Sequence, residues 1–147
     1  MKIFHWLLIA LIFVCNHSEA QQKFAFKWFP NPSEFIKSNK ETLFTYNEYC
    51  ELIKIDEIDF DVLVSDKGVI QKIAYDSSSA LQDSLAYGYK LSKGLAIKTS
   101  AILMQHIKLT NFDPNSQGAK DGKPIWIVMS LFFSPKDREH LQPWKSP

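Results

Sequence analysis

The chain has 147 residues, of which 46% are hydrophobic and 22% charged, and its formal net charge is +1. This composition is typical of a globular chain rather than a disordered one, and the length favours a single domain. A net charge so near zero excludes electrostatic capture as a basis for binding nucleic acid or an acidic membrane surface, so we expect no nucleic-acid partner.

The N-terminal residues have the pattern of an export signal. Lys2 gives a short basic start, and the apolar run Ile3–Cys15 follows it. Ser18 and Ala20 supply the small residues that a signal peptidase requires before its cut. The apolar run is shorter than the ~20 residues of a membrane-spanning helix, and an uncleaved anchor is the alternative. We therefore predict that residues 1–20 are a cleaved signal peptide and that the mature protein is periplasmic or secreted.

Two helices are expected after a short extended stretch at Phe24–Phe29. Asn31 is a suitable N-cap, and Pro32 suits the first helical position. Thr45 and Glu48 stand three residues apart, as in a capping box that opens a second helix. These helices form an N-terminal extension before the first strong strand pattern.

A hairpin comes next. Its first strand alternates, with Ile58, Phe60, Val62 and Val64 on one side and Asp59, Asp61, Leu63 and Ser65 on the other. Asp66–Gly68 is the turn, where glycine takes a positive φ at little cost. The returning strand is expected to place Val69, Ile73 and Tyr75 on one face and Ile70, Lys72 and Ala74 on the other. A period of two predicts an antiparallel pair with one covered face.

Residues 80–111 are predicted to be helical, with Ser79 as the N-cap and Gly94 as a break or bend. The apolar side of the first segment is expected at Leu81, Leu85, Tyr89 or Gly88, and Leu91. That of the second segment is expected at Ile97, Ala101, Met104 or Gln105, and Ile107. Pro114 ends the helical pattern, and a loop leads to the last strand.

The last strand is apolar on both faces. Ile125, Ile127, Met129, Leu131 and Phe133 face one way, and Trp126, Val128, Ser130 and Phe132 face the other. A strand in a small sheet with one solvated face normally alternates apolar and polar residues. We therefore expect the second apolar face of this strand to be buried by another segment or molecule. The candidates are a partner protein, a second copy of the chain and the helical insertion 80–111.

The order of elements predicts an α+β fold. Its core is a small three-stranded antiparallel sheet, strand–strand–helix–strand, with helices on one face and an N-terminal helical extension. The domain is assigned to residues 21–135, and the polar, Pro-rich residues 136–147 are expected to be a flexible tail. On the helix-covered face we expect a shared core of Phe60, Val62, Ile73, Ile127 and Met129.

Patterns for catalysis or metal binding are weak. Cys50 is the only cysteine left after cleavage, so no intrachain disulfide can form, and we expect it to be a buried apolar residue. His106 lies in an apolar helical run and His140 in the tail, without zinc spacing. Asp59 and Asp61 alternate along a strand, as on a solvated face, rather than in a calcium loop. We predict no enzymatic activity, no cofactor and no metal site.

Five short motifs follow one another between Phe29 and Ser134. They are Phe29–Pro30, Glu34–Asn39, Asp66–Gly68, Phe112–Pro114 and Gly122–Ile125. In this order they resemble the C-terminal domain of TonB-family proteins, in the forms common in Bacteroidetes. The family has tryptophan where Phe112 stands, and it carries a membrane anchor and a Pro-rich spacer before this domain, which this sequence does not show.

The resemblance implies an exported, transport-associated binding module, because domains of this family pair an extended segment of an outer-membrane transporter with their last strand. An edge strand offers unpaired N–H and C=O groups that a partner strand satisfies. The implied partner is an envelope protein, such as an outer-membrane transporter, or a second copy of the chain. The partner-binding residues so implied are Ile125, Trp126, Val128, Ser130 and Phe132.

The alternative is an exported α+β structural or small-ligand-binding domain unrelated to TonB. A deep apolar pocket with converging polar groups would favour this alternative. The turns Asp66–Gly68 and Gly122–Pro124 at opposite ends of one three-stranded sheet would favour the TonB-like domain.

The export hypothesis is tested by the mass of the mature chain. Cleavage is expected between Ala20 and Gln21, because small residues precede this bond. Protein purified from the cell envelope should therefore have an intact mass that begins at Gln21, with or without cyclisation of that glutamine. A mature species that retains Met1 would contradict the prediction and indicate an uncleaved anchor.

Overall fold

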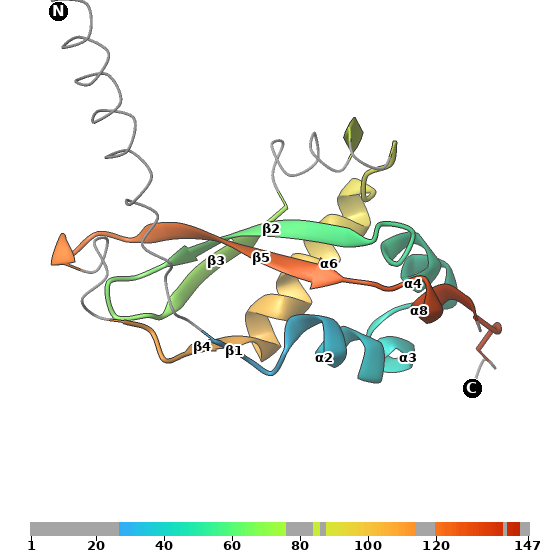
Figure 1. Cartoon of the computed structure of the whole chain (residues 1–147), viewed down its shortest axis with the longest axis horizontal. Helices are drawn as coiled ribbons and strands as arrows, with labels where there is room; N and C mark the ends of the chain where they lie inside the picture. The colour runs from blue at the N-terminus through green and yellow to red at the C-terminus, as the bar shows by residue number, and fades with distance from the viewer. Residues whose placement is uncertain (1–26, 76–83, 86–87, 114–119, 140, 145–147) are drawn as a thin grey trace, which may run out of the picture.

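A computed structural model describes residues 27–75, 84–85, 88–113, 120–139 and 141–144. The signal-peptide residues, the expected cap at Ser79, Leu81 of the expected helix side, Pro114 and His140 lie outside these ranges. In Figure 1 the helices gather on one side of a twisted sheet. The fold is α+β with a three-stranded sheet, as predicted.

The three-stranded sheet has β2 (Glu57–Val64) at its centre. On one side β2 pairs with β3 (Ile70–Ala74), and on the other with β5 (Ile125–Phe132), both antiparallel. The β2–β5 ladder runs without interruption from Glu57 opposite Phe132 to Val64 opposite Ile125. Among the described elements, β3 and β5 are therefore the two edges of this sheet.

The helix-covered face of the sheet is the main core. Burial alternates strictly along β2, where Ile58, Phe60, Val62 and Val64 are fully buried. The core set predicted from the sequence is confirmed, since Phe60, Val62, Ile73, Ile127 and Met129 are all buried. Burial of such side chains supplies most of the favourable free energy of folding.

The hairpin turn depends on a glycine in two ways. Gly68 has φ +76°, a conformation that side chains other than glycine rarely adopt. A Cβ at Gly68 would also stand 2.7 Å from the Phe112 side chain, which packs against the turn. Any other residue at this position would therefore strain the turn and collide with Phe112.

The phase of β3 was predicted wrongly near the turn. The register shifts between Leu63 and Val64, so that Lys72 pairs with Leu63 but Ile70 pairs with Val64. This bulge rotates the first residues of the strand. Ile70 consequently packs against the core, while Val69, which was expected on the covered face, is 61% exposed.

The N-terminal helical extension is present, as α2 (Pro32–Ser38), α3 (Lys40–Leu43) and α4 (Tyr46–Leu52). Asn31 caps α2 by accepting a hydrogen bond from the Glu34 N–H at 3.1 Å. Thr45 and Glu48 form the expected capping box at the start of α4. Cys50 in α4 is half-buried rather than buried, because its side of the helix is only partly covered.

The helical region predicted over 80–111 is interrupted, and it ends earlier than expected. Ser84 and Leu85 are helical, Gly88–Ser92 has no regular structure, and α6 (Lys93–His106) starts after the N-cap Ser92. Gly94 thus lies in the first turn of α6 and does not interrupt a longer helix. Beyond α6, β4 (Lys108–Thr110) pairs with β1 (Lys27–Phe29) in a second, two-stranded sheet. Propensity alone did not reveal β4, because its pairing partner lies about eighty residues away.

The buried side of α6 also differs from the prediction. The residues that face the sheet are Leu95, Ala96, Thr99 and Leu103. Ile97, Ala101 and Met104, which were expected to be buried, are exposed, whereas Ile107 and Leu91 are buried as expected. The helix is apolar on two sides, so its sequence pattern could not decide which side contacts the core.

Contacts with α4 fix the position of α6. The Lys98 ammonium lies 2.6 Å from the Glu48 carboxylate, and the Ser92 N–H donates to the Glu51 carboxylate at 2.7 Å. Burial alone would raise the pKa of Glu48, but the hydrogen bonds from Lys98 and from Thr45 outweigh it and lower that pKa. These contacts hold α6 beside β3.

The described C-terminal residues, as far as Trp144, pack on the domain, whereas the sequence predicted a flexible tail from residue 136. Lys136–Glu139 forms α8, and Arg138 donates hydrogen bonds to the Ile53 carbonyl at 3.0 Å and to the Asp56 carboxylate at 2.5 Å. The Trp144 ring packs 5.6 Å from that of Tyr49, between ring centroids. Specific partners on the domain order this polar segment, and its composition did not show them. Within the described residues, no helix is long and apolar enough to cross a membrane.

The two turns do not lie at opposite ends of the sheet. Ile125 pairs with Val64, which places the start of β5 and the Asp66–Gly68 turn at the same end. Turns at opposite ends were expected of a TonB-like domain, and this expectation was wrong. Antiparallel pairing of β5 with β2 brings the start of β5 next to the end of β2, and therefore the two turns together, in any sheet of this strand order. The position of the turns therefore does not distinguish a TonB-like domain from the alternative.

Truncation of the central core residue tests the packing. Phe60 is fully buried and stands opposite Met129. Phe60→Ala is expected to lower the free energy of unfolding by about 3–5 kcal/mol, through lost apolar burial and the cavity left behind. Urea denaturation followed by circular dichroism measures this loss. A loss below ~1 kcal/mol would mean that the side chain is not in a close-packed core.

Candidate functional site

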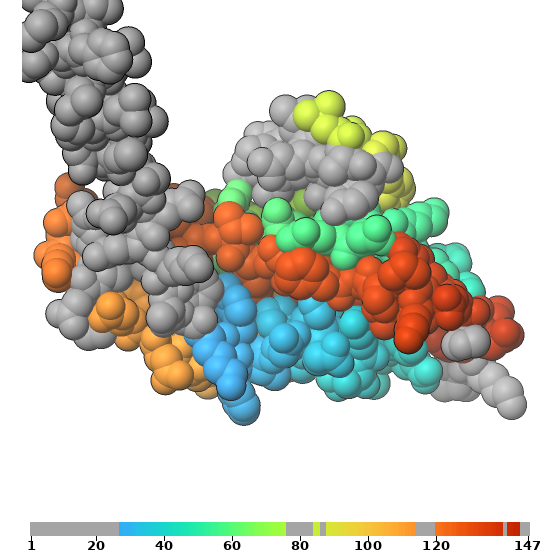
Figure 2. Space-filling view, in the orientation of Figure 1, coloured from blue at the N-terminus to red at the C-terminus, as the bar shows by residue number. Residues whose placement is uncertain are grey.

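The candidate site is the free edge of β5. This strand carries the residues expected to bind a partner, and β2 lies on only one side of it. Figure 2 shows β5 as a band on the surface, bordered by β2 on one side and by α2 on the other. The backbone N–H and C=O groups open to a partner strand are therefore those in the part of β5 that α2 does not contact.

The direction of the backbone groups along β5 follows from two hydrogen bonds at its end. The Phe133 N–H donates to the Asp56 carbonyl at 2.7 Å, toward the β2 side, whereas the Phe132 N–H donates to the Ser33 hydroxyl at 2.8 Å, away from it. Direction alternates along an antiparallel strand. The N–H and C=O groups of Trp126, Val128 and Ser130 therefore point to the free edge.

The Phe132 end of this edge is already occupied. Ser33 lies in α2 and is buried, and its hydroxyl accepts the outward Phe132 N–H. An incoming strand cannot use that N–H unless α2 moves. The pairing groups available to a partner are thus those of Trp126–Ser130.

Three large apolar side chains of β5 project from the face opposite the helices. Trp126, Val128 and Phe132 are each more than half exposed, at 56%, 55% and 56%. An exposed row of this kind, beside unpaired strand groups, is uncommon on a protein that binds nothing. The sequence-based division of β5 into two apolar faces is confirmed, and one of the two faces is uncovered by the described elements.

The two other predicted residues behave differently. Ser130 shares the exposed face, where its hydroxyl hydrogen-bonds the Asp59 carboxylate at 2.5 Å. Ile125 is half-buried and lies on the opposite, helix-covered face. The structure therefore brings together Trp126, Val128, Ser130 and Phe132, and it leaves Ile125 out of the set.

Side chains of the neighbouring strands extend the exposed face. Leu63 of β2 stands opposite both Trp126 and Lys72, which makes one row across three strands. The Lys72 ammonium lies 6.0 Å from the centroid of the Trp126 ring, a contact worth about 0.5–1 kcal/mol at exposed sites. Sequence reasoning missed Leu63 and Lys72, although their positions in the alternating pattern put them on this face.

The centre of this face is acidic. Glu57, Asp59 and Asp61 follow one another at every second position of β2, opposite Phe132, Ser130 and Val128. The register places Asp59 and Asp61 on the face away from the core, but both are half-buried rather than on a fully solvated face as predicted. The site is therefore an apolar edge row with a row of carboxylates one strand further in.

Groups with catalytic or metal-binding chemistry do not converge on this edge. His106 ends α6, and its ring packs 4.8 Å from that of Phe35, between centroids. In the part of the chain that the structure describes, no three His, Cys, Asp or Glu side chains are placed to hold a metal ion. The chemistry that the edge offers is backbone hydrogen bonding and apolar contact.

Comparison with known proteins gives no identity for this chain. No protein-family model, no curated protein and no solved structure matches it.

Proline at two adjacent positions tests the direction of the strand groups. Val128→Pro removes an N–H that points to the free edge, so the fold should persist. Met129→Pro removes an N–H that bonds to β2 and should lower the free energy of unfolding by roughly 3 kcal/mol or more. Circular dichroism with thermal denaturation measures both. If Val128→Pro unfolds the domain and Met129→Pro does not, the assigned direction is reversed; if both unfold it, β5 is not a free edge.

Proposed function

We propose that this chain is an exported binding module that pairs an extended segment of an envelope protein with the free edge of β5. One observation carries the proposal: β5 is an edge strand whose outward backbone groups stand beside an uncovered apolar row. Strand addition uses both features at once, since the backbone supplies affinity and alternate side chains supply specificity.

The geometry limits how the partner would bind. Trp126, Val128 and Ser130 offer their N–H and C=O groups, and each added hydrogen bond contributes about 0.5–1.5 kcal/mol net. The rest of the affinity must come from burying apolar surface at Trp126 and Val128, which are more than half exposed. A partner segment needs apolar side chains at alternate positions, so that they lie beside these two residues on the same face.

The segment would be short. Because Ser33 closes the edge at Phe132, pairing extends over about the five residues Trp126–Ser130. Because the Ser33 hydroxyl accepts the Phe132 N–H, a partner strand cannot pair with β5 beyond Ser130. This limit favours a linear segment in a mobile part of the partner over a full strand of a folded sheet.

The resemblance to TonB C-terminal domains supports the envelope as the place of action. Two of its motifs meet in space, since Phe112 of the aromatic-x-Pro motif packs against Gly68 of the turn. The proposed partner is accordingly an envelope protein, with an outer-membrane transporter as the first candidate. The resemblance extends to the mode of binding and does not by itself imply energy transduction.

The alternative function, a small-ligand-binding domain, called for a deep apolar pocket with converging polar groups. The hollow between β3 and α6, about 850 Å³, is instead an open groove. Among the described residues, its lining is apolar at the Met104 end and carries Lys90 and Lys93 at the Tyr75 end, and these polar groups do not converge at an enclosed base. Strand addition at β5 is therefore the function that the geometry supports best.

Site-specific photocrosslinking tests the proposal. A photoreactive phenylalanine analogue is placed at Val128, and separately at Val69, which is equally exposed but lies on the hairpin turn. In envelope extract, the Val128 probe should capture a protein through a segment with alternating apolar residues, and the Val69 probe should not. Val128→Pro, present in a chain probed at Trp126, should abolish the capture by blocking the backbone pairing.

Two results would overturn the proposal. Equal capture from Val69 and Val128 would show that the contact is not specific for β5. A crosslink from Val128 only to a second copy of the chain would make the chain its own partner, with homodimerisation in place of binding to another envelope protein.

A further inference from the structure

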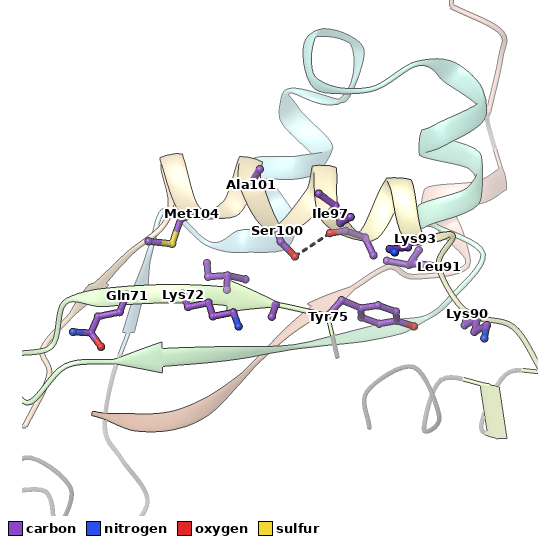
Figure 3. A pocket seen from close by; sticks show the side chains of 13 residues that line it. Gln71, Lys72, Tyr75, Lys90, Leu91, Lys93, Ile97, Ser100, Ala101 and Met104 are labelled. Carbon is purple, nitrogen blue, oxygen red and sulfur yellow. Dashed lines mark hydrogen bonds between the residues drawn. The ribbon is translucent and has the colours of Figure 1, made fainter. Parts of the chain in front are cut away.

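A groove runs along the other edge of the sheet, between β3 and α6 (Figure 3). Its volume is about 850 Å³, and it is open along its length rather than enclosed. Residues 71–75 form one wall, and α6 with the residues just before it forms the other. β2 separates this edge from the free edge of β5, and Lys72 is the one described residue that the two surfaces share, with its ammonium on the Trp126 side.

Backbone groups of β3 point into the groove. The Phe133 N–H bonds to Asp56, so the even-numbered residues of β2 direct their N–H and C=O groups toward β5, as the outward Phe132 N–H also requires. Because this direction alternates along a strand, the backbone groups of the odd-numbered residues of β2 point toward β3. Ala74 and Lys72 pair with such residues and therefore bond to β2. Ile73 lies between them, so its N–H and C=O groups face away from β2, toward the groove.

The helix wall is apolar and uncovered. Ile97 is 61% exposed and Met104 is 39% exposed, and Ala101 lies between them on the same side of α6. This is the side that the sequence pattern predicted to be buried against the core. The core contacts of α6 are made by its other side, so these residues form a second apolar stripe that the described elements leave open.

The charged side chains among the described residues that line the groove are all basic. They are Lys72, Lys90 and Lys93. In Figure 3, Lys90 and Lys93 lie at the Tyr75 end and Met104 at the Gln71 end. Within the described residues, no carboxylate forms an ion pair with these three lysines. The groove thus has one apolar end and one basic end.

The dimensions fit an extended chain. At ~3.3 Å per residue, Gln71–Tyr75 spans about 13 Å, and at ~1.5 Å per residue, Lys93–Met104 spans about 16 Å. A strand segment of about four residues has this length. A compact ligand would fill only part of such a groove and would leave the outward Ile73 groups unused.

We propose that this groove binds an extended peptide segment that carries apolar residues and an acidic end, by strand addition to β3. The backbone of the segment pairs with Ile73, its apolar side chains contact Ile97 and Met104, and its acidic group lies beside Lys90 and Lys93. This site is separate from the proposed β5 site and does not depend on it.

Titration of the purified protein with defined peptides tests the proposal. One fluorescein-labelled peptide has two glutamates followed by alternating valine and threonine, and the matched peptide has lysines in place of the glutamates. Fluorescence anisotropy should show the acidic peptide binding at least about tenfold more tightly than the basic one. Amide hydrogen exchange by NMR should slow at Ile73 on addition of the acidic peptide, and should not change at Val128.

Variants on the two edges separate this site from the β5 site. Ile97→Glu and Lys93→Glu are both on the exposed surface of α6, and each should weaken binding of the acidic peptide by about tenfold or more. Ile97→Leu should retain binding, and so should Val128→Pro, which alters only β5. Circular dichroism of each variant confirms that it is folded.

Three outcomes would overturn the proposal. The first is affinity for the acidic peptide weaker than about 1 mM, or equal to that for the basic peptide. The second is loss of binding in Val128→Pro but not in Ile97→Glu, which assigns the peptide to β5. The third is tighter binding of decanoate, an amphipathic carboxylate without backbone amides, which would indicate a small-molecule site.

Discussion

The pairing of β2 with β5 is the constraint on which the rest of the structure depends. Eight residues of each strand pair in one unbroken register, and Phe60, Val62, Met129 and Leu131 meet on the covered face. A shift of one residue would turn all of these side chains toward solvent, so burial fixes the register. Once β2 is central and its register is set, the direction of every N–H group on β3 and β5 follows. The two candidate sites are thus consequences of how the core packs.

The two edges of the sheet offer different surroundings to an incoming strand. At β5 the edge borders an open, apolar face, and α2 closes one end through the Ser33 hydroxyl. At β3 the edge borders α6, which supplies an apolar wall and basic residues at one end. Natural proteins usually protect long strand edges with charge, bulges or a covering helix. Here β3 has a bulge and a helix beside it, whereas the Trp126–Ser130 edge of β5 has neither, which is why we assign the main function to β5.

The sequence predicted those features that local patterns determine. Strict alternation in β2 predicted its buried face, Gly68 predicted the positive φ of the turn, and Thr45 with Glu48 predicted the capping box. Features that depend on distant partners were missed. β4 pairs with β1, α8 is held by Arg138 on Asp56, and the bulge that exposes Val69 follows from the β2–β3 register. Both α6 and β5 are apolar on two sides. The sequence assigned the residues of β5 to its two faces correctly, but it did not show which side of α6 packs on the sheet.

The central claim is that Trp126–Ser130 is a free strand edge, and amide hydrogen exchange of the unbound protein tests it most directly. We expect alternation: fast exchange at Trp126, Val128 and Ser130, whose N–H groups point outward, and slow exchange at Ile127, Met129 and Leu131, which bond to β2. Phe132 should exchange slowly as well, because Ser33 accepts its N–H. Uniformly slow exchange from Trp126 to Leu131 would contradict the account, since it would mean that the edge is already paired in the protein alone.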